Sequence, residues 1–157
     1  MKTFAPANIL LPKNVAFEKW AVIACDQFTS QPEYWQRVRE NVGEEVSTLN
    51  LVFPEAELNV DRVERIKNIN ENMVKYLAAD LFAEYQDAYI YVERTLKNGV
   101  VRKGIVGVID LEQYDYNADS KSAIRATEQT VLERIPPRVE IRRNASMELP
   151  HVLLLCD

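Results

Sequence analysis

The chain has 157 residues, of which 47% are hydrophobic and 27% charged, with only 4 glycines and 7 prolines. This composition excludes a disordered tail and a collagen-like repeat, and the length suits a single domain over residues 1–157 with a hydrophobic core. The formal net charge of −5 gives no reason to expect nucleic acid or an anionic membrane as a partner.

A buried strand followed by an amphipathic helix is predicted near the N-terminus. Residues 20–25 (WAVIAC) are apolar without polar alternation, which is typical of a strand buried on both faces. Ser30 can form a capping box with Glu33, and apolar residues then recur every three or four positions, so we expect a helix over residues 31–42. Gly43 ends this helix.

A second strand and a long helix come next. Residues 49–53 (LNLVF) are predicted to form a strand that Pro54 stops. Asn59 then caps a helix of about six turns, whose apolar positions are spaced by three and four residues. These positions are Val60, Val63, Ile66, Ile69, Met73, Val74, Leu77 and Leu81.

A β-hairpin is predicted in the middle of the chain, between residues 88–96 and 101–110. The Asn-Gly pair at 98–99 favours a two-residue type I′ turn, in which both residues take a positive φ. Such a turn pairs Leu96 with Val101 across the two strands.

The C-terminal third is predicted to hold one more helix and one more strand. Pro136 and Pro137 fit the first turn of a helix that runs to about Asn144. The alternative for the same segment is an alternating strand with the sequence RVEIR. An apolar strand at residues 152–156 closes the chain.

The predicted order β-α-β-α-β-β-α-β indicates a mixed α/β domain, with one mixed sheet of about five strands and two to three helices. Gly104 and Gly107 lie within the second strand of the hairpin and indicate close packing or a bulge.

Because an apolar strand ends the chain without a cap, we expect this chain to be the N-terminal portion of a larger protein. A sheet edge left unpaired there would favour a homodimer through that edge.

The sequence predicts a cytoplasmic protein without a metal site. The first 13 residues lack the continuous apolar core of a secretory signal, and no run reaches the ~18 apolar residues that span a bilayer. Cys25 and Cys156 each end an apolar run and show no metal-ligand spacing, so we expect buried, unbridged thiols. No Walker A, GxGxxG, GxSxG or HExxH string is present, and a structural role is favoured for the only histidine, His151.

The segment Ile124–Arg143 is the densest polar stretch. It holds Arg125, Arg134, Arg138, Arg142 and Arg143, interleaved with Glu128, Glu133 and Glu140. Guanidinium groups suit bidentate binding of phosphate or carboxylate, and a helix that begins near Pro137 would add its N-terminal amides to an anion site. The alternative is a network of internal pairs between these arginines and glutamates.

A second polar string, ACDQFTSQPEYW, follows the first predicted strand. Asp26 would lie at the carboxyl end of that strand, where α/β proteins place functional groups, and Thr29 at the start of the following helix. The alternative is that these residues only make a turn and a helix cap.

Three long segments resemble a bacterial and archaeal family known only as domain of unknown function 1015. They are Ala21–Trp35, Tyr91–Tyr116 and Ile124–Leu155, and together with their connections they cover nearly the whole chain. Gln129 stands where the family pattern has Gly, and Thr127 where more distant members have His. The resemblance implies a full-length protein more than twice this size, with a C-terminal remainder as the partner of this chain. That remainder would carry an Asp-Gly-His-His-Arg string similar to the nucleotide-binding box of ParB-like and free-serine-kinase proteins, which implies a nucleotide for the full-length protein and no cofactor in this chain.

Two hypotheses for function follow. In the first, the chain is one wall of a cytoplasmic small-molecule enzyme that transfers phosphoryl groups, with Glu128 as the residue that orients or deprotonates a substrate hydroxyl. The residues expected to bind a small anionic ligand or the substrate are Arg125, Arg134, Arg138, Arg142, Asp26 and Thr29. In the second, the chain is a non-catalytic domain that positions or regulates a partner domain.

Overall fold

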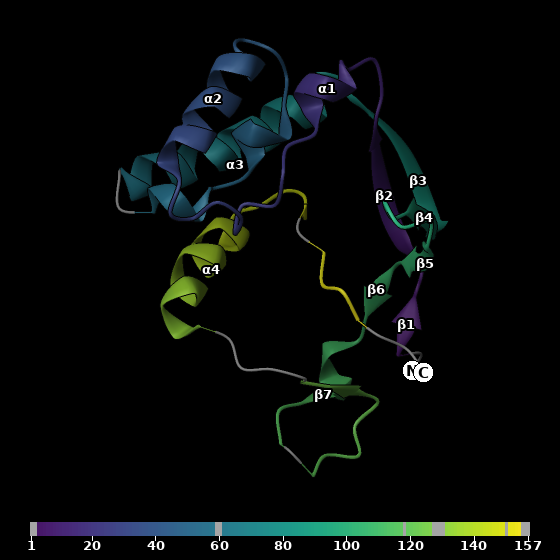
Figure 1. The fold of residues 1–157 in the computed structure, drawn as a ribbon. Helices are drawn as coiled ribbons and strands as arrows, with labels where there is room; N and C mark the ends of the chain where they lie inside the picture. Colours follow the sequence, from purple (N-terminus) through teal and green to yellow (C-terminus); the bar gives the residue numbers. More distant parts are fainter. Residues whose placement is uncertain (1–2, 59–60, 118, 127–130, 150, 155–157) are drawn as a thin grey trace. The chain divides into compact units, whose positions relative to one another are not determined.

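The computed structural model describes residues 3–58, 61–117, 119–126, 131–149 and 151–154, and its fold is mixed α/β, as predicted (Figure 1). The chain divides into two compact units. Unit 1 comprises Met1–Leu11 and Phe82–Thr130 and holds the strands, whereas unit 2 comprises Pro12–Leu81 and Val131–Asp157 and is helical.

Unit 2 is built from short and long helices around an aromatic and aliphatic core. Its elements are α1 (Phe17–Trp20), α2 (Pro32–Val42), the 3-10 turns η1 (Thr48–Leu51), η2 (Glu55–Glu57) and η4 (Leu132–Arg134), and the helices α3 (Arg62–Ala78) and α4 (Ile135–Arg143). Trp35 is fully buried and packs with Val42 and Leu49. The helices are therefore held by buried side chains of α2 and η1.

The helix expected over residues 31–42 is confirmed as α2, but its predicted cap is wrong. Gln31 is the N-cap residue and makes no side-chain capping bond, so the expected capping box of Ser30 does not form. The backbone N–H of Gln31 donates instead to the carbonyl of Phe28 at 3.1 Å. A hydrogen-bonded turn therefore precedes the helix, and no side chain caps it. Gly43 ends the helix with φ +59°, as predicted.

The two strands expected at residues 20–25 and 49–53 are wrong. Trp20 ends the short helix α1, residues 21–24 are irregular, and the 3-10 turn η1 covers the start of the second segment. Side chains provide hydrogen bonds that a sheet would have supplied: the Thr48 hydroxyl donates to the Trp20 carbonyl at 2.7 Å, and the Ser47 hydroxyl accepts from the Leu49 amide at 3.2 Å. The second segment is buried at Leu49, Leu51 and Phe53, whereas most of the first segment after Trp20 is exposed.

The long helix is confirmed as α3, with an apolar face built from Ile66, Ile69, Met73 and Tyr76, all buried. Its expected cap and first residue, at 59–60, lie outside the described residues. The helix is shorter than the six turns expected, because it ends at Ala78 and leaves Leu81 outside it, and the remaining apolar positions Val63, Val74 and Leu77 are exposed.

Unit 1 contains four two-stranded pairings among the described residues, in place of the single sheet of about five strands that was expected. Three of the pairings are β1 (Phe4–Ala5) with β6 (Val108–Ile109), β2 (Ala7–Pro12) with β3 (Phe82–Ala88), and β4 (Ile90–Thr95) with β5 (Val101–Val106). The fourth is a short parallel pairing of β7 (Tyr114–Asp115) with β8 (Ile124–Arg125), after the 3-10 turn η3 (Leu111–Gln113). The strands of β2–β3 and β4–β5 have six or seven residues, whereas those of the other two pairings have two and offer few ladder bonds.

The predicted hairpin forms as β4 and β5, but with a longer turn and a shifted register. Thr95 pairs with Val101, and the Leu96 amide donates to the Val100 carbonyl at 2.8 Å, so three residues make the loop. Gly99 has φ +82°, whereas Asn98 does not take a positive φ, which excludes the type I′ turn. The observed register sets Glu93 opposite Lys103 and Arg94 opposite Arg102, one attractive and one repulsive pair.

The two glycines of the hairpin strand differ in their surroundings. A Cβ at Gly107 would lie 2.6 Å from the carbonyl oxygen of Ala5 and 2.7 Å from the ring of Phe4, so the close packing expected from the sequence is confirmed there. A Cβ at Gly104 would meet nothing within 4 Å. Gly107 is therefore required by the approach of another segment, whereas Gly104 is not.

The C-terminal segment keeps its helix but not its strand. The helix that begins with the two prolines is confirmed as α4, so the alternative strand RVEIR is wrong. Residues 152–154 are irregular and exposed, and the remaining residues of the expected strand lie outside the described part of the chain. His151 is exposed and makes no hydrogen bond to the described residues, so the structural role expected for it is not seen.

Replacement of Gly99 by valine should weaken the hairpin by about 1 kcal/mol, because a β-branched residue resists the positive φ of this position. Hydrogen exchange of the Leu96 amide should then become roughly fivefold faster. The matched control is Gly104→Val, in the neighbouring strand, which has space for a side chain and should leave exchange unchanged or slower. Equal effects of the two substitutions would contradict the turn geometry.

Candidate functional site

The turn η2 carries two buried carboxylates, each paired with two arginines. The side chains of Glu55 and Glu57 are 7% and 11% exposed, respectively. The turn is anchored to the preceding segment because the Glu55 amide donates to the Cys25 carbonyl at 2.8 Å. Four guanidinium groups therefore meet two carboxylates, all within unit 2.

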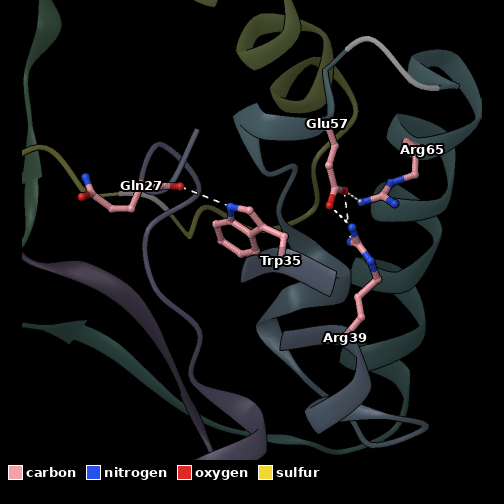
Figure 2. A network of polar contacts seen from close by, with 5 residues as sticks. All are labelled: Gln27, Trp35, Arg39, Glu57 and Arg65. Carbon is pink, nitrogen blue, oxygen red and sulfur yellow. Dashed lines mark hydrogen bonds and ion pairs between the residues drawn. The ribbon is translucent and has the colours of Figure 1, made fainter. Parts of the chain in front are cut away.

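Glu57 joins α2 to α3 (Figure 2). Arg39 from α2 binds both of its carboxylate oxygens, and Arg65 from α3 donates to Oε2 at 3.0 Å. The Arg65 guanidinium also lies 5.4 Å from the centre of the Phe53 ring. Burial lowers the pKa of Arg39 and of Arg65, and the charge of Arg65 lowers the pKa of Arg39 further. This cluster fastens α2 to α3.

Glu55 joins η2 to the start of α4. Arg134 Nε lies 3.2 Å from Oε2, and an Nη2 atom of Arg138 donates to Oε1 at 2.5 Å. The side chains of Arg134 and Arg138 are 43% and 45% exposed, so solvent still reaches both guanidinium groups. The hydrogen bond to Glu55 raises the pKa of Arg138, against the opposing effect of burial.

The turn before α2 contributes Cys25 and Asp26 to the surroundings of Arg138. Burial raises the pKa of the Cys25 thiol, the charge of Arg138 opposes this shift, and the charges of Asp26 and Glu55 add to it. The thiol is therefore protonated near neutral pH. The turn is strained, because Phe28 takes φ +52°.

Two aromatic contacts hold this turn in place. The Phe28 ring stacks on Tyr34 with the ring centres 4.1 Å apart, and the indole N–H of Trp35 donates to the Gln27 carbonyl at 3.2 Å (Figure 2). Asp26 and Thr29 are exposed on the turn. Asp26 was expected at the carboxyl end of a strand. This prediction is wrong, because residues 21–24 are irregular.

The structure brings some of the predicted site residues together and leaves others apart. Arg134 and Arg138 converge on Glu55, in the electrostatic surroundings of Asp26. Arg142 instead pairs with Glu148 at 3.0 Å. Arg125 is exposed in unit 1 at β8, and Glu128 lies outside the described residues.

The arginines expected to pair within their own segment take acids from elsewhere. Glu140 binds Arg62 of α3 with two hydrogen bonds, at 2.6 and 3.0 Å, and the acids of Arg134 and Arg138 come from η2. The backbone N–H groups at the N-terminus of α4 were expected to take part in an anion site. They can add little to it, because Pro136 and Pro137 have no N–H. The prediction of a local arginine–glutamate network is therefore wrong in its partners.

Sequence reasoning missed the acids that organise both clusters. Glu55 and Glu57 follow Pro54, which was interpreted only as the end of a strand. The one available signal was a pair of acids two residues apart directly after an apolar run, a pattern that also occurs in exposed turns. Burial of this turn depends on contacts with α2 and α3, and these contacts are not visible in the local sequence.

Two further properties concern the described part of the chain alone. Its helices include none that combines the length and the apolarity needed to cross a bilayer. Its His, Cys, Asp and Glu side chains form no group of three or more that could hold a metal ion.

The fold and the two clusters define a mixed α/β protein with a helical unit fastened by buried carboxylates and arginines. The chain belongs to the family described as "Protein of unknown function (DUF1015)", whose model matches residues 5–157. The resemblance found in the sequence is thereby confirmed. No curated protein and no solved structure matches the chain.

Replacement of Glu57 by glutamine should destabilise unit 2 by about 2 kcal/mol, because it leaves Arg39 and Arg65 close together without their shared carboxylate. Both tryptophans of the chain lie in unit 2, so their fluorescence during urea unfolding reports on it. Glu148→Gln, which removes an exposed pair, should cost less than about 1 kcal/mol. Equal losses in the two variants would contradict the structural role of Glu57.

The Cys25 thiol should react slowly with iodoacetamide at neutral pH, with a rate midpoint above the ~8.5 of an ordinary cysteine. The measurement is alkylation rate against pH in a Cys156→Ser background. Arg138→Gln should move the midpoint further up, because it removes the charge that favours the thiolate. A midpoint below 8, which flags an activated thiol, would contradict this prediction.

Proposed function

We propose that the protein binds a small anionic ligand through Arg134 and Arg138, and that it forms one wall of the site of a cytoplasmic small-molecule enzyme. One observation carries the proposal. Two half-exposed guanidinium groups converge on a single buried carboxylate, Glu55, so N–H donors that Glu55 does not use remain at the surface.

The chemistry of the guanidinium group supports an anion of the phosphate or carboxylate kind. Each arginine has five N–H donors in a planar fork, and Glu55 takes only part of this capacity from Arg134 and Arg138. Glu55 would hold the two side chains in place without neutralising both of them. Asp26 and Thr29, exposed on the turn before α2, would contact polar groups of the ligand beside its anion.

The proposed reaction is phosphoryl transfer, which depends on positioning and on stabilisation of charge. In this reaction Glu128 would orient or deprotonate a substrate hydroxyl. The nucleotide would be bound together with the C-terminal remainder that the family resemblance implies. The protonated thiol of Cys25 is unsuited to act as a nucleophile near neutral pH, which favours this chemistry over thiol catalysis.

The second candidate function is a non-catalytic domain that positions or regulates a partner domain. The same contacts support it, because the bond from Arg138 to Glu55 joins residues that are 83 positions apart and so stabilises the unit. A purely structural role requires that the arginines be needed for folding. An anion site requires that they be needed for ligand response.

The double variant Arg134→Gln with Arg138→Gln separates the two functions. Inorganic phosphate and ATP should raise the melting temperature of the wild-type chain, measured against sodium chloride of the same ionic strength, and the double variant should lose this response while remaining folded. Arg142→Gln is the control, because its partner Glu148 lies outside the cluster, and it should keep most of the response. A double variant that unfolds, or a wild type that does not respond, would favour the non-catalytic role.

A further inference from the structure

The helix α3 carries a second stripe of residues beside its buried face. The stripe consists of Val63, Lys67, Asn70, Val74 and Leu77, which are separated in turn by four, three, four and three residues. This spacing is the heptad pattern of a coiled-coil seam. Val63 is 84% and Val74 59% exposed, so the apolar members of the seam are not covered within the described chain.

Shallow grooves follow this seam. One groove of about 620 Å³ lies along Val63, Lys67, Asn70 and Val74, with Glu140 of α4 in its wall. A second groove of about 550 Å³ continues from Val63 and Lys67 toward the start of the helix. The exposed side of α3 thus carries two adjoining shallow grooves, on which a second helix can pack.

We propose that this seam is the contact surface of a homodimer, in which α3 packs antiparallel against α3 of a second copy. In this arrangement Val63 lies against Val74 of the second copy, and Lys67 lies beside Asn70 of the second copy. The two-fold symmetry repeats both contacts, as an isologous interface requires. The inference is independent of the proposed ligand site.

Charge complementarity supports a second copy as the occupant. The charged residues along the first groove are Lys67, Glu71, Glu140 and Arg143, two of each sign, so the surface can pair with itself. Lys67 and Glu71 lie 3.7 Å apart within the helix and are largely exposed, and the antiparallel arrangement brings each of them next to the opposite charge of the second copy. A parallel arrangement would place Lys67 beside Lys67 of the second copy, and these two positive charges repel each other.

The size of the seam predicts a weak dimer. From Val63 to Leu77 the seam is about 21 Å long at 1.5 Å per residue. A contact between two single helices of this length buries less surface area than a standard stable interface. Association should therefore show at concentrations of roughly 10–200 μM.

Sedimentation equilibrium of the 157-residue chain over this concentration range tests the proposal. The wild type should form dimers as the concentration rises, and Val74→Asp should remain a folded monomer, since the side chain is exposed in the monomer. Val139→Asp is the matched control, because Val139 is an exposed helical valine of α4 outside both grooves. It should dimerise like the wild type.

A charge exchange provides a second readout that does not depend on folding. Lys67→Glu should weaken dimerisation at least tenfold, and the additional change Glu71→Lys should restore it. A wild type that is monomeric throughout the range would overturn the proposal. Dimers that persist in Val74→Asp, or that are lost equally in Val139→Asp, would overturn it as well and would point to another surface, such as a sheet edge of unit 1.

Discussion

Unit 2 depends on one short turn that places two carboxylates among four arginines. Glu55 and Glu57 lie two residues apart in η2, and each is largely buried. A buried carboxylate without partners would cost several kcal/mol, so this turn can be buried only while the arginines remain in place. The ion pairs of η2 therefore hold α2, α3 and α4 in position relative to this turn.

The two carboxylates serve different ends although they share a turn. Glu57 receives Arg39 and Arg65, whose pKa values are both lowered by burial, and this cluster acts as a clamp between helices. Glu55 receives Arg134 and Arg138 near the surface, where their charges remain accessible to solvent. The arginines of the two clusters are exposed to a similar extent, 34–40% and 43–45%, so the Glu55 cluster is distinguished by its position beside the exposed turn that carries Asp26.

The strained turn before α2 adds to the chemical character of the second cluster. Phe28 is held at a positive φ by stacking on Tyr34, and the same turn carries Cys25 and Asp26 next to Arg138. Backbone strain of this kind persists only where surrounding contacts determine it, and it is frequent at functional sites. Stability and candidate function are thus concentrated on the same few segments of unit 2.

The sequence alone determined those features that depend on near neighbours. The three- and four-residue spacing of apolar positions identified α2 and α3 as helices, although Tyr76 of the core of α3 was missed, and Gly43 marked the end of α2. The paired prolines identified the start of α4, and the long motifs of the chain identified its family. Local periodicity and backbone restrictions act within a few residues, so they are legible without a tertiary structure.

Only the tertiary structure decided which charges meet and which apolar runs form sheets. Arg138 finds its acid 83 residues away, and nothing in its own segment distinguishes that partner from nearer glutamates. Leu49, Leu51 and Phe53 are buried in a 3-10 turn and irregular chain, which can have the same composition as a buried strand, whereas Ile23 in the other apolar run is exposed. The hairpin register is shifted by one residue because three residues, and not two, make the loop that connects the strands. Long-range packing and electrostatics select among locally equivalent alternatives, and for that reason the candidate site became visible only in the fold.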